Sequence, residues 1–133
     1  MTVRVIRDMA APMRHEIIID RNRLATDGSL EEGGEGSGPS PHDLYDSALG
    51  ACKALTVLWY AKKKGIPVEG IEVAVERDAS QERAGTYRLK AELTVTGNLT
   101  PEQREELLRV AHKCPVHKLM TEVTTEISTS LAR

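Results

Sequence analysis

The sequence predicts an α+β fold with mostly antiparallel sheets around one long central helix. Segments in which apolar and polar residues alternate occur near the N-terminus and again in the second half, which is typical of half-buried strands. Two segments with helix-capping signals lie between and after them. The resulting order is strands, helix, hairpin, helix, strand, which favours antiparallel pairing. The 133 residues have the length of a single domain, 1–133.

The N-terminal part predicts short strands and a loop. Two strands are expected at residues 3–5 and 15–20, joined by a turn that contains Pro12, which cannot donate to a strand ladder. A third short strand is expected at 23–26. Residues 27–40, "DGSLEEGGEGSGPS", contain five glycines and three serines, a composition that predicts a flexible loop.

A long helix is expected to begin directly after this loop. Ser40 suits the capping position, Pro41 suits the first helical position, and Asp43 completes a capping-box pattern. The helix is expected to end at the lysines 62–64, because cations are favoured in a last turn and Gly65 follows.

Most of the circumference of this helix is apolar. Thirteen of the eighteen residues from 44 to 61 are apolar, and three of the five exceptions, Asp46, Gly50 and Lys53, form one narrow stripe. So short a chain has little material to cover such a helix, so a second copy is expected to cover part of it. A homodimer is therefore predicted; the alternative is a helix enclosed between two sheets of one monomer.

The second half predicts a hairpin, a helix and a last strand. Alternation at 71–76 and 87–95 indicates two strands joined over the loop "DASQERAG". The next helix opens with the capping pattern of Thr100 and Gln103, and it must break near Cys114 because Pro115 follows. Alternation from Val123 to Leu131 predicts the last strand.

Charge and hydropathy argue against nucleic-acid and membrane partners. The net charge is −2, and acidic and basic residues are interspersed, so the basic surface that nucleic-acid binding requires is missing. No segment approaches the ~18 apolar residues of a membrane span, and the N-terminus lacks the apolar run of a signal peptide. A cytoplasmic location is expected.

Metal binding is one interpretation of the histidines around the second cysteine. Cys114 lies between His112 and His117, but structural zinc prefers four ligands in tight local pairs such as Cys-x-x-Cys, which this chain lacks. The histidines are more typical of solvated residues near a helix end. No metal or other cofactor is expected.

Redox chemistry is the other interpretation of the two cysteines. Cys52 lies among small and apolar residues of the long helix, a pocket suited to an organic peroxide, but burial disfavours a thiolate unless a cation is near. Lys53 points about 100° away around the helix. An arginine from the N-terminal strands is therefore expected, with Arg14, Arg21 and Arg23 as candidates. Cys114 is expected on an exposed, mobile turn, as a resolving thiol.

The segment "GPSPHDLYDSALGACKALTVLWYAKKKG", followed by "CPVHK", resembles the OsmC/Ohr family of osmotically inducible and organic hydroperoxide resistance proteins. The resemblance implies an OsmC-like fold, an intertwined homodimer, and a thiol-dependent peroxidase for small organic hydroperoxides without metal or haem. It implies Cys52 as peroxidatic cysteine, Cys114 as resolving cysteine, and a dithiol reductant such as a lipoyl group.

Two further residues follow from the resemblance. Ser40-Pro41-His42 stands where the family's hydroperoxide reductases typically have Asn-Pro-Glu, so Asp43 is the nearest acidic residue. Asp43 would serve Cys52 through a kink near Gly50 or from the partner subunit. Arg14 is the best match to the catalytic arginine. Two other functions stay open: a module that binds a small hydrophobic ligand or senses thiols without turnover, and thiol transfer or persulfide chemistry.

Overall fold

The structure is a computed structural model that describes all residues from 1 to 133. Its contacts divide the chain into two compact units, residues 1–47 and 48–133, which are described separately below. The elements are antiparallel strands and three α-helices, one helix more than the sequence predicts. No helix in this structure combines the length and apolar character needed to cross a membrane.

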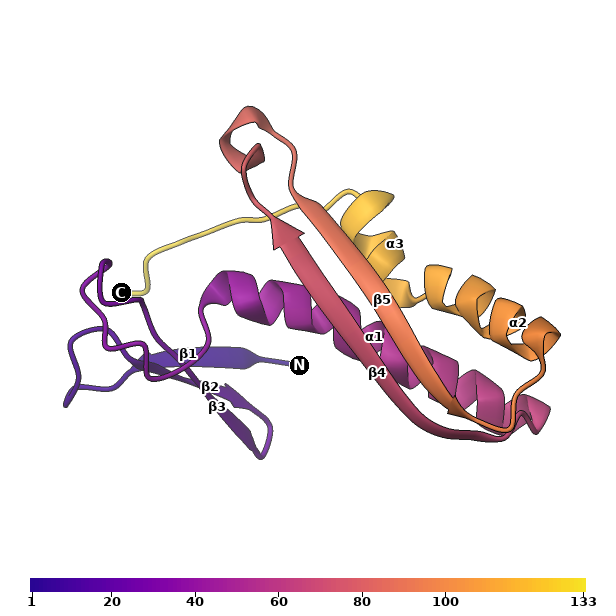
Figure 1. The fold of residues 1–133 in the computed structure, drawn as a ribbon. Coiled ribbons are helices and arrows are strands. Elements are labelled where there is room, and N and C mark those ends of the chain that lie inside the picture. Colours follow the sequence, from indigo (N-terminus) through magenta and orange to yellow (C-terminus); the bar gives the residue numbers. More distant parts are fainter. The chain divides into compact units, whose positions relative to one another are not determined.

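The first unit is built on a three-stranded antiparallel sheet in the order β1-β2-β3 (Figure 1). β1 spans Val3–Arg7, β2 spans His15–Ile19 and β3 spans Asn22–Thr26, close to the predicted positions. Asp20 turns the chain between β2 and β3 with a φ of 53°, a left-handed conformation that Asp tolerates better than most residues. The central strand carries the one buried residue of the sheet, Ile17.

The glycine-rich segment 27–40 contains no helix or strand but is organised around one carboxylate. Oδ1 of Asp27 accepts a hydrogen bond from the Gly28 amide at 2.8 Å, and Oδ2 accepts from the Ser37 hydroxyl at 2.7 Å and amide at 3.0 Å. These bonds, led by that of the Ser37 hydroxyl, lower the pKa of Asp27 to about 2. The predicted flexible loop is therefore an ordered turn assembly.

Helix α1 spans Pro41–Lys64, with the predicted start and end. The Ser40 hydroxyl accepts from the Asp43 amide at 3.1 Å, and an Asp43 carboxylate oxygen accepts from the Ser40 amide at 3.0 Å, which is a complete capping box. At the other end Gly65 adopts a φ of 67°, the left-handed conformation that glycine supplies after a helix.

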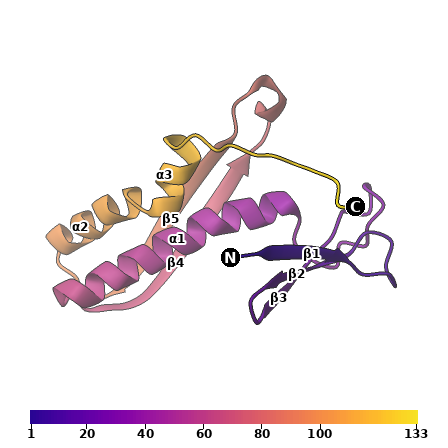
Figure 2. The ribbon, with the colours of Figure 1, turned by 180° about the vertical axis from the view of Figure 1, so that it is seen from behind.

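The second unit combines a long hairpin with three helical segments. β4 (Val68–Asp78) pairs with β5 (Arg88–Gly97), and the short 3-10 helix η1 (Glu82–Ala84) lies between them. The hairpin crosses α1 in both opposite views (Figures 1 and 2). The core between α1, the hairpin and α2 (Pro101–His112) contains five buried residues: Val57, Ala61, Ile66, Leu107 and Ala111.

The hairpin approaches α1 closely at Gly50. A Cβ at this position would lie 3.2 Å from Cγ2 of Val75, so any larger residue would press on β4. The stripe of exceptions on the otherwise apolar helix is therefore turned inward: Asp46, Gly50 and Lys53 are all buried. Leu55 and Trp59, by contrast, are 68% and 61% exposed.

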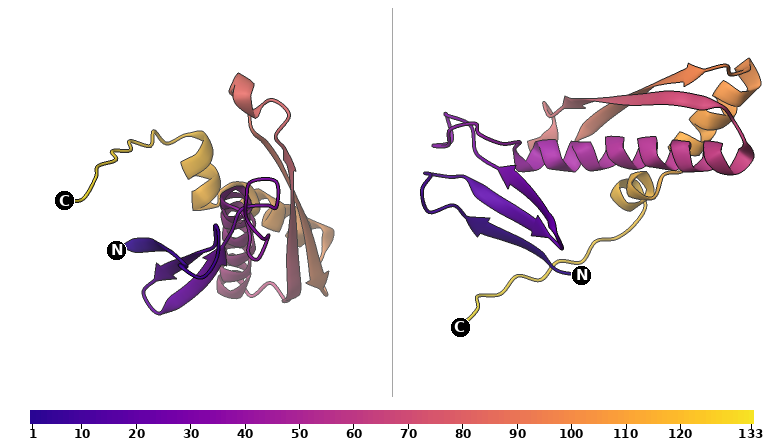
Figure 3. Two further views of the ribbon diagram at one scale, coloured as in Figure 1. Left: turned by 90° about the vertical axis from the view of Figure 1, so that its left-hand side faces the viewer. Right: turned by 90° about the horizontal axis from the view of Figure 1, so that it is seen from below.

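α2 begins with the predicted capping box of Thr100 and Gln103 and ends at His112. A third helix, α3 (Pro115–Thr121), which the sequence reading did not include, starts directly after Cys114, because proline is well suited to a first helical position. Viewed along α1, the hairpin lies on one side of this helix and α3 on another (Figure 3).

The predicted last strand is wrong for this chain. Residues 124–133 have no regular secondary structure, and Ile127 and Leu131 are 83% and 96% exposed. A strand requires a neighbouring strand for its backbone hydrogen bonds, and the sheet of the second unit consists of β4 and β5 alone. The C-terminal segment thus has the alternating apolar and polar residues of a strand, but no neighbouring strand pairs with it.

Candidate functional site

The second unit brings the two cysteines together. Cys52 lies in the middle of α1, and Cys114 is the second of the two residues between α2 and α3. Both are free thiols, and their side chains are hydrogen-bond neighbours. The amide of Val116 in the first turn of α3 donates to Sγ of Cys52 at 3.4 Å. The pair is thus formed by packing the α2–α3 corner against α1.

Cys114 is completely buried, with 0% of its surface exposed. The expectation of an exposed thiol is wrong, because Cys114 is buried at the corner where Pro115 starts α3. Burial raises the pKa of Cys114, while a hydrogen bond from the His117 amide and the charge of Lys53 act in the opposite direction. Cys114 is therefore favoured as a neutral thiol in the resting protein.

Cys52 is the more accessible of the two thiols. Its side chain is only partly buried, and its Sγ lies 3.9 Å from the hydroxyl of Thr56, one turn along α1. The Val116 amide donates to this sulfur, and in the contact with Thr56 either atom can be the donor. A solute that enters the site meets Cys52 before it meets Cys114.

Lys53 is the cation that the structure places at this pair. Its side chain is only 5% exposed, and its Nζ donates to the carbonyl oxygen of Ala111 at 2.8 Å. Nζ also lies 2.9 Å from Nδ1 of His117. From the sequence, Lys53 is not expected to be the cation for Cys52, because its side chain points away from Cys52. In the structure this side chain points to the α2–α3 corner that carries Cys114.

His117 completes this cluster from α3. Because a protonated lysine only donates, Nδ1 of His117 accepts, and the proton of the neutral ring is on Nε2. Burial, followed by the charges of Lys53 and His112, lowers the pKa of His117. The histidine expected to be a solvated surface residue is half-buried and holds a lysine in place.

A pocket of about 200 Å³ lies beside this cluster. Its polar lining consists of Lys53, His112 and His117. The remaining lining residues are apolar and come from α1, β5 and α2: Leu49, Leu89, Ala91, Leu93, Leu108 and Ala111. The part of the hairpin that lines this pocket is therefore apolar.

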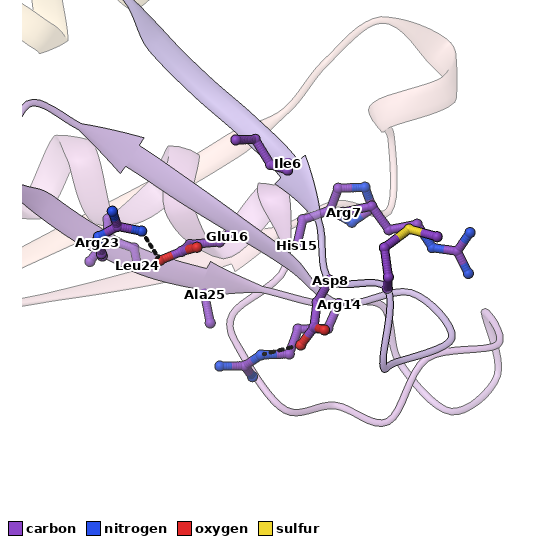
Figure 4. Close-up of a pocket in the computed structure, with 10 residues that line it drawn as sticks. Ile6, Arg7, Asp8, Arg14, His15, Glu16, Arg23, Leu24 and Ala25 are labelled. Carbon is purple, nitrogen blue, oxygen red and sulfur yellow. Dashed lines mark hydrogen bonds and ion pairs between the residues drawn. The ribbon is translucent and has the colours of Figure 1, made fainter.

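Arg14, the predicted activating arginine, belongs to the first unit. Its Nη1 donates to the carbonyl and hydroxyl oxygens of Ser37, both at 2.9 Å, and its Nε lies 3.9 Å from Asp8. Arg14 and Arg23 both line a pocket of about 520 Å³ on the three-stranded sheet, where Arg23 pairs with Glu16 at 2.7 Å (Figure 4). The activating role of Arg14 stays a prediction.

Asp43 has a structural task in the first turn of α1, where it caps the helix together with Ser40. α1 runs without a break from Pro41 to Lys64, and the role of Asp43 at Cys52 stays a prediction. The rings of His112 and His117 lie 6.5 Å apart, and no group of three or more His, Cys, Asp or Glu side chains is arranged to hold a metal ion.

A signal for Lys53 was present in the sequence. Leu49, Lys53, Val57 and Ala61 recur at four-residue spacing, and all four are buried. A lysine within such a row has its charged end inside the protein and requires polar partners there. No sequence signal identifies those partners, since Lys53 and His117 are 64 positions apart.

Comparisons with known proteins agree with this architecture. A family model described as OsmC-like protein matches residues 34–129. An OsmC-like protein from Mycoplasma pneumoniae is 17% identical, with a TM-score of 0.73, over 92% of this chain and 87% of that one. A comparison with curated proteins returned no significant match.

Two further solved structures are described as organic hydroperoxide resistance proteins. OsmC from Legionella pneumophila is 22% identical, with a TM-score of 0.65, over 92% of this chain and 90% of that one. OhrB from Bacillus subtilis is 25% identical, with a TM-score of 0.59, over 92% of each chain. The match of the family model over most of the chain, together with the α+β fold shared with these structures, shows that this protein belongs to the OsmC/Ohr family.

Proposed function

We propose that this protein is a thiol-dependent peroxidase that reduces small organic hydroperoxides in oxidative stress defence in the cytoplasm. The observation that supports it is the contact between a partly exposed thiol, Cys52, and a buried thiol, Cys114. Two structural relatives are described as organic hydroperoxide resistance proteins. Two neighbouring thiols are the groups that a thiol-dependent reduction of a hydroperoxide uses.

The accessible thiol has the first step. The thiolate of Cys52 attacks the distal peroxide oxygen, an alcohol leaves with the second oxygen, and Cys52 becomes a sulfenic acid. The Val116 amide donates to the Cys52 sulfur and stabilises its negative charge before the attack. Arg14 is proposed to add a positive charge and Asp43 to help orient it, in the assembled protein.

The buried thiol has the second step. Cys114 attacks the sulfur of the sulfenic acid, forms the disulfide and releases water. Because Cys114 is fully buried, peroxide in solution reaches it only through the Cys52 site, which protects the resolving thiol from direct oxidation. A dithiol reductant, such as a lipoyl group, reopens the disulfide by thiol exchange.

We also propose that the working form is a homodimer of single-domain subunits. Leu55 and Trp59 form part of an exposed apolar stripe on α1, next to the partly exposed Cys52. Large exposed apolar side chains on one helix face are typical of an interaction surface.

A stoichiometric oxidation experiment tests the peroxidase. Reduced protein is mixed with one equivalent of cumene hydroperoxide, and free thiols and intact mass are measured. We expect the loss of two thiols per chain and a mass decrease of about 2 Da, because disulfide formation removes two hydrogens. Cys52→Ser should abolish both changes, and Cys114→Ser should leave a sulfenic acid that dimedone traps.

Persistence of both thiols in excess peroxide would contradict the peroxidase and favour a binding or thiol-sensing module. The feature that favours this second candidate is the pocket of about 200 Å³ with its leucine-lined wall. Small hydrophobic ligands bind in cavities lined mainly by such residues. Changes in the NMR chemical shifts of the Leu89 and Leu93 methyl groups on addition of a small hydrophobic ligand would support it.

A further inference from the structure

Lys53 occupies a position at which an apolar residue is the ordinary choice. It follows Leu49 and precedes Val57 in the buried row of α1, and it is 5% exposed. Removing an ammonium group from water costs several kcal/mol unless charges or hydrogen bonds compensate for it. The groups around its Nζ must therefore compensate for the cost of burying this charge, and they indicate its role.

The hydrogen-bond partners of the ammonium are polar but carry no negative charge. They are the carbonyl oxygen of Ala111 near the C-terminus of α2 and Nδ1 of His117 in α3. The pocket wall adds His112 from α2, whereas the residues from β5 are apolar. The positive charge is solvated by these groups, but none of them neutralises it.

A buried thiol at the same corner can supply the missing negative charge. Cys114 lies between Ala111 and His117 in the sequence and is fully buried, and the charge of Lys53 favours ionisation of its thiol against the effect of burial. The same corner places Cys114 beside Cys52. A thiolate at Cys114 would thus have a counter-ion on one side and its reaction partner on the other.

We propose that Lys53 is the positioning residue that supplies the counter-charge for the Cys114 thiolate, with His117 holding its ammonium in place. This inference rests on the proposed thiol peroxidase function and assigns the cation of the resolving step. This cation comes from α1 and stabilises the thiolate of Cys114, whereas the sequence predicts an arginine that stabilises the thiolate of Cys52.

The step balances without a further reactant. Cys114 loses its proton, and its thiolate attacks the sulfur of the Cys52 sulfenic acid; the S–O bond breaks as the S–S bond forms. The departing hydroxide takes up a proton and leaves as water. When a dithiol reductant attacks the disulfide at Cys52, the electron pair returns to Cys114, and Lys53 stabilises this leaving thiolate, which speeds exchange.

The thiolate itself is the direct readout of this role. In a Cys52→Ser background, Cys114 is the remaining cysteine, and absorbance at 240 nm reports its thiolate after subtraction of the Cys52→Ser/Cys114→Ser protein, which has the same three tyrosines. We expect Lys53→Met to raise the titration midpoint by about 1–3 pH units, the range for loss of a neighbouring opposite charge. Lys53→Arg should keep most of the effect.

Controls separate charge from packing. Lys62→Met removes an exposed lysine from the same helix and should leave the midpoint unchanged. Circular dichroism verifies folding, and if the methionine variant is unfolded, Lys53→Gln, which keeps a donor for the Ala111 carbonyl without the charge, replaces it. A folded neutral variant with the parental midpoint would overturn the proposal.

A peroxide pulse on the otherwise unchanged protein distinguishes this proposal from the proposed function. Lys53→Met should oxidise Cys52 at the normal rate but retain the sulfenic acid for longer, seen as stronger dimedone labelling before the disulfide forms. Equal rates of disulfide formation in parent and variant would overturn the role in resolution. Absence of any oxidation in the parent would refute the peroxidase and leave the titration result as it stands.

Discussion

Nζ of Lys53 lies 2.9 Å from Nδ1 of His117, and this contact links the middle of α1 to the first turns of α3 across 64 positions of sequence. The same ammonium group donates to the Ala111 carbonyl of α2 at 2.8 Å. One buried side chain therefore connects all three helices at the corner that contains Cys114. The tests below follow from this corner and from its surroundings.

The stability of the protein is expected to fall as the pH drops below about 6.5, the ordinary pKa of a histidine. Burial and Lys53 lower the pKa of His117 in the folded state, so below this pH the unfolded chain binds a proton that the folded protein excludes. The stabilisation is complete above the unfolded pKa and is lost as the pH falls toward the folded one. Urea denaturation at several pH values measures it.

The variant His117→Asn separates this effect from other titrations. Asparagine retains an acceptor for Lys53 but does not titrate in this range, so its stability should fall less between pH 7.5 and pH 5.5 than that of the parent. His42→Asn, at an exposed position in the first turn of α1, is the matched control and should keep the parental pH dependence. An identical pH dependence in all three proteins would show that His117 is not the responsible group.

Gly50→Val is expected to lower the free energy of unfolding by about 1–3 kcal/mol, the usual cost of overpacking. The first added carbon would lie 3.2 Å from Cγ2 of Val75, so the hairpin must move away from α1. Ala48→Val, at an exposed position of the same helix, controls for the helix propensity of valine. Equal urea midpoints for the two variants would contradict the close approach at Gly50.

Asp27→Asn should loosen the glycine-rich segment between β3 and α1. The folded-state pKa of Asp27 is about 2 against an ordinary 3.8, so the parent keeps this stabilisation above pH 3.8 and loses it as the pH falls toward 2. Hydrogen exchange of the Ser37 amide reports the contact, and we expect faster exchange in the variant at neutral pH. Exchange as slow as in the parent would show that the carboxylate does not organise the segment.

Trp59→Glu is expected to weaken the proposed homodimer about tenfold or more, as loss of a central interface aromatic usually does. Trp59 is 61% exposed on the apolar stripe of α1, and a carboxylate there resists burial by a second copy. Sedimentation should show the parent near twice 14.6 kDa and the variant nearer 14.6 kDa. Lys62→Glu, one turn away, is the control, and a parent that sediments as a monomer would refute the dimer.

Local signals predicted the elements well where their causes are local. The capping boxes of Ser40 with Asp43 and of Thr100 with Gln103 form as expected, because each partner lies within one helical turn of the other. α3 was overlooked although Pro115 is a typical first residue of a helix. The last strand was predicted wrongly, because its alternating pattern is a local signal whereas a strand also requires a pairing strand elsewhere in the fold.

The sequence by itself determined the α+β class, the long helix with both of its ends, and the resemblance to the OsmC/Ohr family, and it predicted the two cysteines as the reactive pair. Only the tertiary structure decided which cation accompanies the thiols and which cysteine is accessible. Helix caps and periodicity depend on neighbours in the chain. The burial of Cys114 and the partners of Lys53 depend instead on how α2 and α3 pack against α1, which no spacing along the chain encodes.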